Sequence, residues 1–455
     1  MDYFNYLGND WFGYIKIKIK GISLNIFLNK KILIYGLGKS GLSAFQFLKK
    51  KNEIFLYDDF ISKIKNSSIK KNLISYKTIY NFKFDLIILS PGIDINKCKL
   101  TKLLKKNRNK IYSDLDVFYS FYKNDCITIT GTNGKSTTCQ LLYEILLKHN
   151  LNVKLVGNIG NPILSVKNVK EKTLFIIEAS SYQLEYSKIF KSKYAVILNL
   201  SPDHIERHHS LNKYVNAKFK LLKNQTKNNI AFVKKKDLLI EKEIKNNNFK
   251  SKIIKVNTFE KSSITDKIKN DYFFTETNKE NLAFVLAISK KFNLKNTLIL
   301  KVLQNFRGLK YRQQIVYKKN NLTIINDSKS TSFSSSVGLL KTKKKIYWLI
   351  GGMHKKKDKF NLKKKYFKNK NVFIFGSNRK FFNEKLKNKM KINNFKNLDD
   401  ALKKVLLLTK KEKNFERIIL FSPCAASFDS FKNFEERGIY FNNLIKKYLY
   451  GKQKI

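Results

Sequence analysis

The sequence is poor in several residue types, and each shortage excludes a class of protein. Its 455 residues include only four prolines, five histidines and four cysteines. The cysteines (Cys98, Cys126, Cys139 and Cys424) form no C-x-x-C pair, which argues against a zinc ribbon or a disulfide framework and fits a reducing compartment. No apolar run approaches the ~18–20 residues of a membrane span, and the N-terminus lacks the basic and apolar segments of a secretory signal. We therefore predict a cytoplasmic protein with no membrane partner.

Acidic residues are also scarce, and the 92 lysines and arginines against 34 acidic side chains give a formal net charge of +58. Such a charge is typical of nucleic-acid binders. Lysine is nevertheless spread over nearly every predicted surface segment, together with abundant Asn, Ile, Tyr and Phe, rather than gathered in one tract. Because these residues share AT-rich codons, compositional drift explains the bias. We predict no specific nucleic-acid partner.

Short apolar runs ending in Gly, Ser, Pro or Asp recur along the chain, with amphipathic stretches between many of them. Near-continuous apolar runs suit strands buried on both faces of a parallel sheet, and strand–helix alternation predicts an α/β fold. The predicted strands cover residues 31–36, 85–91, 126–131, 174–178, 195–202, 322–327, 346–351, 372–376 and 417–423. The predicted helices cover residues 40–50, 137–149 and 278–290.

The four prolines lie outside the predicted helices. Pro91, Pro202 and Pro423 each follow a serine at the end of a predicted strand, and Pro162 closes a Gly-Asn-Ile-Gly-Asn turn. The carboxyl ends of parallel strands are where open α/β sheets bind ligands. These prolines mark either ligand-facing loops or ordinary loop punctuation.

A glycine-rich loop follows the strand at 126–131 and precedes a predicted helix. Its residues are Gly131, Thr132, Asn133, Gly134, Lys135, Ser136, Thr137 and Thr138. Backbone N–H groups of such a loop bind phosphates, helped by the positive end of the helix. Lys135 would neutralise the β- and γ-phosphate oxygens, and the Ser136 hydroxyl would bind Mg²⁺. The loop is shorter than the general G-x-x-x-x-G-K-[ST] pattern. It predicts a bound nucleoside triphosphate, against the alternative of a strand–helix turn with a fortuitous lysine.

A second glycine-rich loop, residues 36–41, has the G-x-G-x-x-G spacing after the first predicted strand. Asp58 and Asp59 end the next strand about 20 residues further on, as in a dinucleotide-binding domain. Alone, this motif would imply an NAD-dependent dehydrogenase. Any diphosphate nucleotide can use the same glycines, however, and a second phosphate loop in one chain disfavours a dehydrogenase.

Acidic and imidazole side chains follow two further strands. Glu178 ends one, and Asp203 and His204 come after another. Carboxylate, hydroxyl and imidazole groups could complete a magnesium shell, although imidazole is a softer ligand than magnesium usually takes. For His208 and His209 we predict solvated loop positions.

In the last third of the chain, polar and cationic residues follow three predicted strands, at 326–331, 351–355 and 422–429. Together they predict a cleft for an anionic substrate. Each segment alone could be a capped helix start.

Taken in this order, these segments resemble the Mur ligase family from Lys31 to about Lys447, and within it the members that add D-glutamate. The resemblance implies three domains. They are a Rossmann-like N-terminal domain for the UDP moiety (1–113, with 1–28 an unplaced extension), a central P-loop ATPase domain with a mainly parallel sheet (114–308), and a Rossmann-like C-terminal domain for the amino acid (309–455).

The resemblance also implies residue roles. ATP would contact residues 131–138, Asn281, Arg312 and Asp327. Two magnesium sites would use Ser136, Glu178, His204 and Lys218, with Lys218 carbamoylated to give a carboxylate-like ligand. The residues implied in catalysis are Lys135, His204 and Lys218. The UDP-substrate would contact Lys39, Ser40, Asp58, Asp59, Ser90, Gly92, Asn158 and Ser180. D-Glutamate would contact Lys329, Thr331, Lys355, Ser427 and Phe434.

The implied reaction joins D-glutamate to UDP-N-acetylmuramoyl-L-alanine through an acyl phosphate, with ATP and Mg²⁺, in cytoplasmic peptidoglycan precursor synthesis by a monomeric enzyme. Alternatives within this chemistry are L-alanine- or diaminopimelate-adding Mur ligases and folylpolyglutamate synthase. Alternatives of a different class are an NAD-dependent dehydrogenase and a nucleic-acid-binding NTPase.

Overall fold

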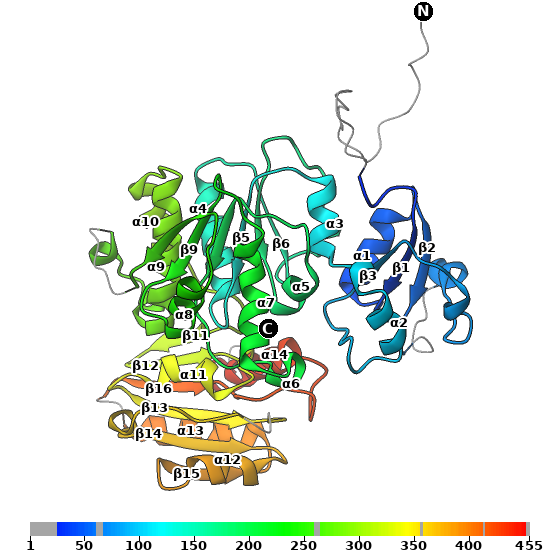
Figure 1. The fold of residues 1–455 in the computed structure, drawn as a ribbon. Helices are drawn as coiled ribbons and strands as arrows, with labels where there is room; N and C mark the ends of the chain where they lie inside the picture. Colours follow the sequence, from blue (N-terminus) through cyan, green and yellow to red (C-terminus); the bar gives the residue numbers. More distant parts are fainter. Residues whose placement is uncertain (1–24, 61–66, 259–263, 355–357, 413–414, 452–455) are drawn as a thin grey trace, which may run out of the picture. The chain divides into compact units, whose positions relative to one another are not determined.

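The computed structural model describes residues 25–60, 67–258, 264–354, 358–412 and 415–451. Apolar segments of this part of the chain form three sheets, one of four strands and two of six (Figure 1). The chain divides into two compact units, residues 1–260 with 283–298, and residues 261–282 with 299–455. Within the described residues, no helix has the length and apolarity needed to cross a membrane.

The first sheet is entirely parallel, with strand order β2-β1-β3-β4. Its core includes Phe27, which the sequence left unplaced and which is fully buried against Tyr112 with ring centroids 5.3 Å apart. The elements are β1 (Lys31–Tyr35), α1 (Lys39–Leu48), β2 (Glu53–Tyr57), β3 (Leu86–Leu89), α2 (Thr101–Lys106), β4 (Ile111–Tyr112) and α3 (Asp114–Phe121).

The second sheet, in the same unit, is also parallel, with order β10-β9-β8-β5-β7-β6. Because β5 lies between β8 and β7, the loops that follow these three strands meet at one edge of the sheet. The strands are β5 (Cys126–Thr130), β6 (Val153–Gly157), β7 (Leu174–Glu178), β8 (Tyr194–Ile197), β9 (Ile230–Lys234) and β10 (Lys252–Val256). The helices are α4 (Lys135–Lys148), α5 (Ser181–Tyr186), α6 (Ile205–His208), α7 (Leu211–Lys223) and α8 (Leu238–Asn246).

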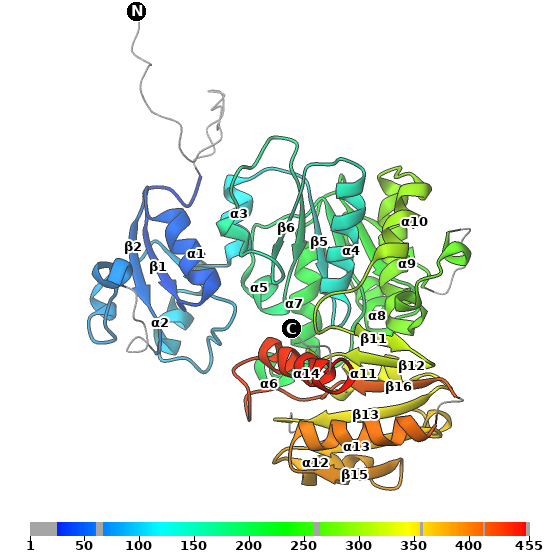
Figure 2. The same ribbon diagram turned by 180° about the vertical axis from the view of Figure 1, so that it is seen from behind.

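The third sheet belongs to the second unit and has order β11-β12-β16-β13-β14-β15, with only the β11–β12 pair antiparallel. Helices α13 and α14 pack on one face (Figure 2), and α11 and α12 pack on the other. The strands are β11 (Gln314–Lys319), β12 (Leu322–Asn326), β13 (Lys345–Gly351), β14 (Lys370–Phe375), β15 (Lys391–Phe395) and β16 (Arg417–Phe421). The helices are α11 (Phe333–Leu340), α12 (Arg379–Leu386), α13 (Leu398–Lys411) and α14 (Phe434–Leu449). Two further helices, α9 (Glu276–Lys291) and α10 (Asn296–Asn305), precede this sheet in the sequence.

The predicted α/β class is confirmed, and each predicted apolar run contains a strand. The strands end before the Ser-Pro pairs, so the prolines lie in strand-end loops. The sequence analysis did not place β9, which lies inside its sheet, or the edge strands β4, β6, β10, β11 and β15. The edge strands β10 and β15, for example, are half exposed and contain lysine. Such strands lack the continuous apolar run of a central strand. The domain boundaries near Ser113 and Gly308 stay predictions.

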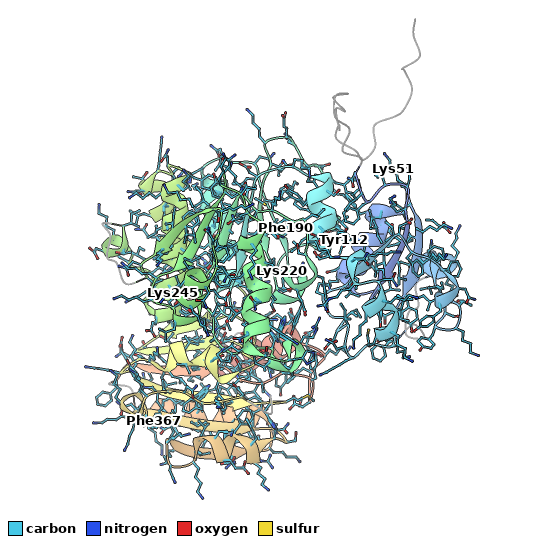
Figure 3. All side chains as sticks on the ribbon, in the orientation of Figure 1. Lys51, Tyr112, Phe190, Lys220, Lys245 and Phe367 are labelled. Atoms are coloured by element: carbon cyan, nitrogen blue, oxygen red, sulfur yellow. The ribbon has the colours of Figure 1, made fainter. Side chains whose placement is uncertain are left out.

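Exposed lysines occur on every part of the chain that carries a sheet. Lys51 follows α1, and Lys245 lies on α8 (Figure 3). This distribution agrees with compositional drift, while the expected lack of a nucleic-acid partner stays a prediction.

Most positive-φ residues in the described part of the chain are glycines or asparagines. Glycines adopt positive φ in strand-end loops, as at Gly36 (φ +93°) and Gly131 (φ +151°). Asparagines adopt it in turns, as at Asn150 (φ +58°) just after α4 and Asn293 (φ +51°) just after α9. Asparagine tolerates this region better than other residues with a Cβ.

Candidate active site

The phosphate loop runs from the end of β5 into α4. Gly131 and Gly134 both have positive φ, of +151° and +85°, which favours glycine. Asn199, in the loop after β8, holds this segment in place. Its carbonyl oxygen accepts a hydrogen bond from Thr132 N at 2.9 Å, and its Oδ1 accepts one from Asn133 N at 2.9 Å.

Two lysines converge on the phosphate loop. Lys135 Nζ donates to the carbonyl oxygens of Gly131 and Thr132, both at 2.9 Å. Lys218, on α7, is 2% exposed, and its Nζ donates to Gly131 O at 2.9 Å and to Thr130 Oγ1 at 3.3 Å. Burial, followed by the charge of Lys135, lowers the pKa of Lys218 well below its usual value. The site therefore holds a cationic lysine beside an amine that loses its proton readily.

Glu178 connects the phosphate loop with the next strand end. It is 1% exposed, and its Oε2 accepts a hydrogen bond from Ser136 Oγ at 2.6 Å. Its Oε1 accepts one from Asn158 Nδ2 at 2.8 Å. Asn158 follows β6 and Glu178 ends β7, so one carboxylate bridges groups from two loops.

A pocket of about 680 Å³ in the first unit has Asn158 in its wall. Its volume is that of a small-molecule site, ~300–1,000 Å³. Of the residues predicted to bind the UDP-substrate, those that line it are Lys39, Ser40, Asp58, Asp59, Ser90, Gly92 and Asn158. Ser180 does not line it, but it caps α5 by hydrogen bonds with Gln183, which does. Pro91 and Pro162 also line the pocket, so two of the four prolines lie in its wall.

The first glycine of the loop in this pocket has a conformation that leaves no room for a side chain. Gly36 has φ +93°, and a Cβ there would lie 2.7 Å from Ser90 Cβ. Ser90 Oγ donates to Gly36 O at 2.6 Å, and Leu37 N donates to Asp58 Oδ2 at 2.7 Å. Asp58 and Ser90 thus hold the backbone of the glycine loop in place.

His204 is the N-cap residue of α6, with φ +52° and a side chain that is 37% exposed. Its Nε2 lies 3.4 Å from Asp203 Oδ2. The loop that carries both residues follows β8, next to β5 in the sheet. His204 therefore belongs to the same edge as the phosphate loop.

The prediction that His208 is solvated is wrong, because α6 turns its side chain inward. His208 is 1% exposed, its Nε2 lies 2.9 Å from Ser181 Oγ, and its ring stacks on Tyr182. Burial, followed by the charge of Arg207, lowers the pKa of His208 to about 4. His209 is exposed, as predicted.

Ser136 and Glu178 fit a magnesium ion, because hydroxyl and carboxylate oxygens are hard donors and the structure already brings them together. Across the described residues, no three His, Cys, Asp or Glu side chains gather in a way that could hold a metal. The predicted set contains only one carboxylate and one imidazole. Lys218 as a free amine offers no oxygen, so it fits the set only after conversion to a carbamate.

The second unit carries the remaining predicted residues. Lys329 and Thr331 follow β12, Ser427 follows β16, and Phe434 begins α14. Lys329 Nζ lies 3.8 Å from the centroid of the Phe434 ring, so these two residues are brought together. Lys355 lies outside the described residues.

The predicted nucleotide contacts Asn281, Arg312 and Asp327 also belong to the second unit. Asp327 is buried, with Ser422 Oγ donating to Oδ2 at 2.7 Å and Gln313 N donating to Oδ1 at 3.1 Å. Burial raises the pKa of Asp327 to about 7. The roles of these three residues in ATP binding stay predictions.

Several residues at these sites were missed by the sequence analysis. Asn199 could have been found, because it is a polar residue near the end of the predicted strand at 195–202. Tyr214, whose hydroxyl lies 2.9 Å from Thr132 Oγ1, gave no signal in a chain with 23 tyrosines. Arg437, buried at the strand ends of the second unit, gave none either, because its partner Ser328 is 109 positions away.

Two family models match the chain. One, described as Mur ligase middle domain, matches residues 129–302, and the other, described as Mur ligase MurD-like, N-terminal domain, matches residues 30–111. The UDP-N-acetylmuramoylalanine--D-glutamate ligase of Rickettsia prowazekii is 33% identical over 450 residues, covering 93% of this chain and 100% of that protein. The protein of the same name from Buchnera aphidicola subsp. Schizaphis graminum is 36% identical over 450 residues, covering 94% and 100%.

Solved structures share the fold at lower identity. UDP-N-acetylmuramate-alanine ligase MurC from Thermotoga maritima has a TM-score of 0.54 at 18% identity, covering 93% of this chain and 100% of that one. MurF ligase from Thermotoga maritima in complex with ADP has a TM-score of 0.55 at 13% identity, covering 93% and 99%. With its motifs, three sheets and full-length relatives, the chain belongs to the Mur ligase family.

Proposed function

We propose that this protein is the ATP- and Mg²⁺-dependent ligase that joins D-glutamate to UDP-N-acetylmuramoyl-L-alanine, releasing ADP and phosphate. The observation that carries the proposal is the position of Glu178. One carboxylate accepts hydrogen bonds from Ser136 in the phosphate loop and from Asn158 in the pocket wall. A nucleotide on the loop and a substrate in the pocket would meet beside it. The full-length relatives named for D-glutamate support the choice of amino acid.

The chemistry follows from the poor reactivity of a carboxylate toward amines. The L-alanyl carboxylate oxygen attacks the γ-phosphorus of ATP, so the bond to ADP breaks and an acyl phosphate forms. The D-glutamate amine then attacks the acyl carbon and loses a proton, and inorganic phosphate leaves the tetrahedral intermediate. In such a transfer the protein forms no covalent bond with the substrates. Catalysis therefore depends on positioning the substrates and neutralising the phosphate charge.

The residues of the phosphate loop would perform that neutralisation. Backbone N–H groups of residues 131–138 and the positive end of α4 would bind the phosphates. Lys135 is positioned at the loop to exchange its two carbonyl acceptors for phosphate oxygens. Ser136, Glu178 and His204 would hold Mg²⁺, which when bound neutralises phosphate charge.

Lys218 would complete the magnesium set as a carbamate. Its neutral amine would attack the carbon of CO₂, giving N-carboxylysine and releasing one proton. Two observations support this: the amine lies 2.9 Å from Gly131 O, and burial together with the charge of Lys135 favours its neutral form. The product would place a negative charge beside Lys135, relieving the repulsion between the two amines.

The test is an ADP-release assay with the purified full-length protein, ATP and Mg²⁺. UDP-N-acetylmuramoyl-L-alanine is supplied with D-glutamate, L-alanine or diaminopimelate in separate reactions, and UDP-N-acetylmuramate with L-alanine in another. We expect ADP only with the first nucleotide and D-glutamate. ADP release from UDP-N-acetylmuramate and L-alanine, or no ADP release in any reaction, contradicts the proposal. A dehydrogenase or a nucleic-acid-dependent NTPase would release no ADP in any of these reactions. The cytoplasmic location and monomeric state stay predictions.

A further inference from the structure

A buried arginine, Arg437, connects the strand ends of the second unit. It lies in the first turn of α14 and is 1% exposed. Its Nε donates to Ser328 Oγ at 3.1 Å, and its Nη2 donates to Ser328 O at 2.7 Å and to Ala425 O at 2.9 Å. Ser328 follows β12 and Ala425 follows β16, neighbouring strands of the third sheet. One side chain therefore ties two strand-end loops together.

The same guanidinium also reaches the loop after β13. A Cβ on Gly352, which has φ +123°, would lie 3.0 Å from Arg437 Nη1 and 2.6 Å from Ala426 O. Met353 and Ala426 exchange backbone hydrogen bonds of 2.9 Å across this point. Arg437 thus contacts the ends of three adjacent strands, in the sheet order β12-β16-β13.

These loops carry the residues predicted to bind the amino acid. Lys329 comes directly after Ser328 and Thr331 two residues later, and Ser427 lies two residues after Ala425. Phe434, which contacts Lys329, lies one helical turn before Arg437, and Ser328 Oγ donates to its carbonyl oxygen at 2.9 Å. All these groups lie within a few residues of the contacts that Arg437 makes.

Within the described part of the chain, Arg437 is a buried cation that has no hydrogen-bonded carboxylate. Its hydrogen-bond partners are carbonyl and hydroxyl oxygens rather than a carboxylate, and Nη1 has no hydrogen-bond partner among the described residues. Burying a cation on neutral partners is costly, and an apolar side chain often stabilises a core as well or better. A positive charge at these strand ends favours a dicarboxylate bound nearby.

We propose that Arg437 is a positioning residue for the amino-acid substrate. Its guanidinium holds the loops after β12 and β16 at the spacing at which Lys329, Thr331 and Ser427 bind D-glutamate. This inference rests on the proposed function and adds to it a residue that need not touch the substrate.

Arg417 provides a matched control in the same sheet. It too is a buried arginine, with Nη1 and Nη2 donating to the carbonyl oxygens of Thr409 and Asn320, both at 2.6 Å, and with Nε unpartnered among the described residues. It begins β16, whereas the Arg437 contact at Ala425 lies beyond the other end of that strand. The two arginines are alike in burial and in having carbonyl partners, but they lie at opposite ends of β16.

The experiment compares Arg437→Lys with Arg417→Lys in the full-length protein. Lysine keeps the positive charge but cannot reproduce the geometry of the three hydrogen bonds that the planar guanidinium of Arg437 makes. We expect both variants to lower Tm, and only Arg437→Lys to raise the KM for D-glutamate, by about tenfold, which is ~1.4 kcal/mol. The KM values for ATP and UDP-N-acetylmuramoyl-L-alanine should stay within about twofold of wild type. An unchanged KM for D-glutamate, or an equal rise in Arg417→Lys, would overturn the inference.

If Arg437→Lys does not fold, Ser328→Ala tests the same inference about the role of Arg437. It removes the hydroxyl acceptor of Nε without burying a new charge, and we expect the KM for D-glutamate to rise by about threefold while Tm changes little. No change in that KM overturns the inference. The wild-type enzyme in the same assay separates failure of the proposed ligase function from failure of the proposed role of Arg437. If the wild type shows no D-glutamate-dependent ADP release, the proposed function itself is contradicted.

Discussion

Lys135 and Lys218 donate hydrogen bonds to the same acceptor, the carbonyl oxygen of Gly131, and both Nζ–O distances are 2.9 Å. Two ammonium groups on one oxygen repel each other, so one of them loses its proton more easily. Lys218 is fully enclosed, and its pKa is lowered by burial first and by Lys135 second. The phosphate loop therefore accepts hydrogen bonds from two lysines in different environments: Lys135, at the start of α4, and the buried Lys218 of α7, which loses its proton more easily.

Lys135→Ala should lower D-glutamate-dependent ADP release by ~10³-fold or more, because it removes the cation that neutralises the transferring phosphate. Binding of UDP-N-acetylmuramoyl-L-alanine, measured by calorimetry, should change by less than about twofold, since Lys135 is not in the pocket lining. Lys148→Ala, at the exposed end of the same helix, is the control. Unchanged turnover in Lys135→Ala would contradict the role of Lys135 in neutralising the transferring phosphate.

Glu178→Gln should raise the Mg²⁺ concentration for half-maximal ADP release by at least about tenfold, because an amide replaces the only carboxylate of the predicted metal set. It should also weaken binding of the UDP-substrate, since Asn158 loses a charged acceptor. The measurement is a magnesium titration of the initial rate. Glu144→Gln is the matched control, because Glu144, like Glu178, accepts a hydrogen bond from another side chain. A magnesium dependence equal to that of wild type would exclude Glu178 as a ligand.

Carbamoylation of Lys218 should be visible as a ¹³C signal of a carbamate carbon when the protein is equilibrated with ¹³C-bicarbonate. The signal should weaken as the pH falls, because protonation removes the amine lone pair that attacks CO₂. Lys218→Gln should lack the signal, while Lys220→Gln, two residues further along α7, should retain it. A wild-type spectrum without the signal at neutral pH would leave Lys218 as an amine and contradict its role as a metal ligand.

Asp327 should make the protein less stable as the pH rises. Its pKa is raised from 3.8 to about 7, so between these values the folded state binds more protons than the unfolded state. The free energy of unfolding therefore falls across this window, by up to ~1.4 kcal/mol for each unit of pKa, and stays low above it.

Asp327→Asn should flatten the dependence of Tm on pH between 4 and 7 and raise Tm at pH 8. The amide can keep a hydrogen bond with Ser422 while removing the buried charge. Asp266→Asn, at an exposed position of the same unit, should leave the profile unchanged. If the profile of Asp327→Asn matches that of wild type, this carboxyl group does not titrate in the window.

The parts of the fold that the sequence could predict depend on burial. Central strands such as β7 and β13 are continuous apolar runs, and the loops after them contain the glycines and polar residues expected at strand ends. Edge strands such as β15 are half exposed and give no such pattern. The phosphate loop could be predicted because its chemistry lies in consecutive residues.

The rest of the site depends on contacts between distant segments. Arg437 and Ser328 are separated by 109 positions, and Tyr214 and Thr132 by 82. His208 was misjudged because its neighbours in sequence are polar, whereas its neighbours in space are the rings of Tyr182 and Tyr214. Sequence periodicity carries no information about such pairs.

Glycine and asparagine, the commonest residues at the left-handed positions described in this chain, meet two different structural requirements. At Gly36 and Gly131 the backbone needs positive φ, and a neighbouring side chain also occupies the place of a Cβ. Asn150 and Asn293 need only the backbone angle, because their turns accommodate a whole side chain. Gly36 and Gly131 therefore mark positions where a Cβ would be crowded as well as positions where the backbone turns. Engineering can use this difference: Asn→Gly changes at the helix-end turns relax the backbone at little risk, whereas Gly→Asn changes at the strand-end loops displace the binding surfaces themselves.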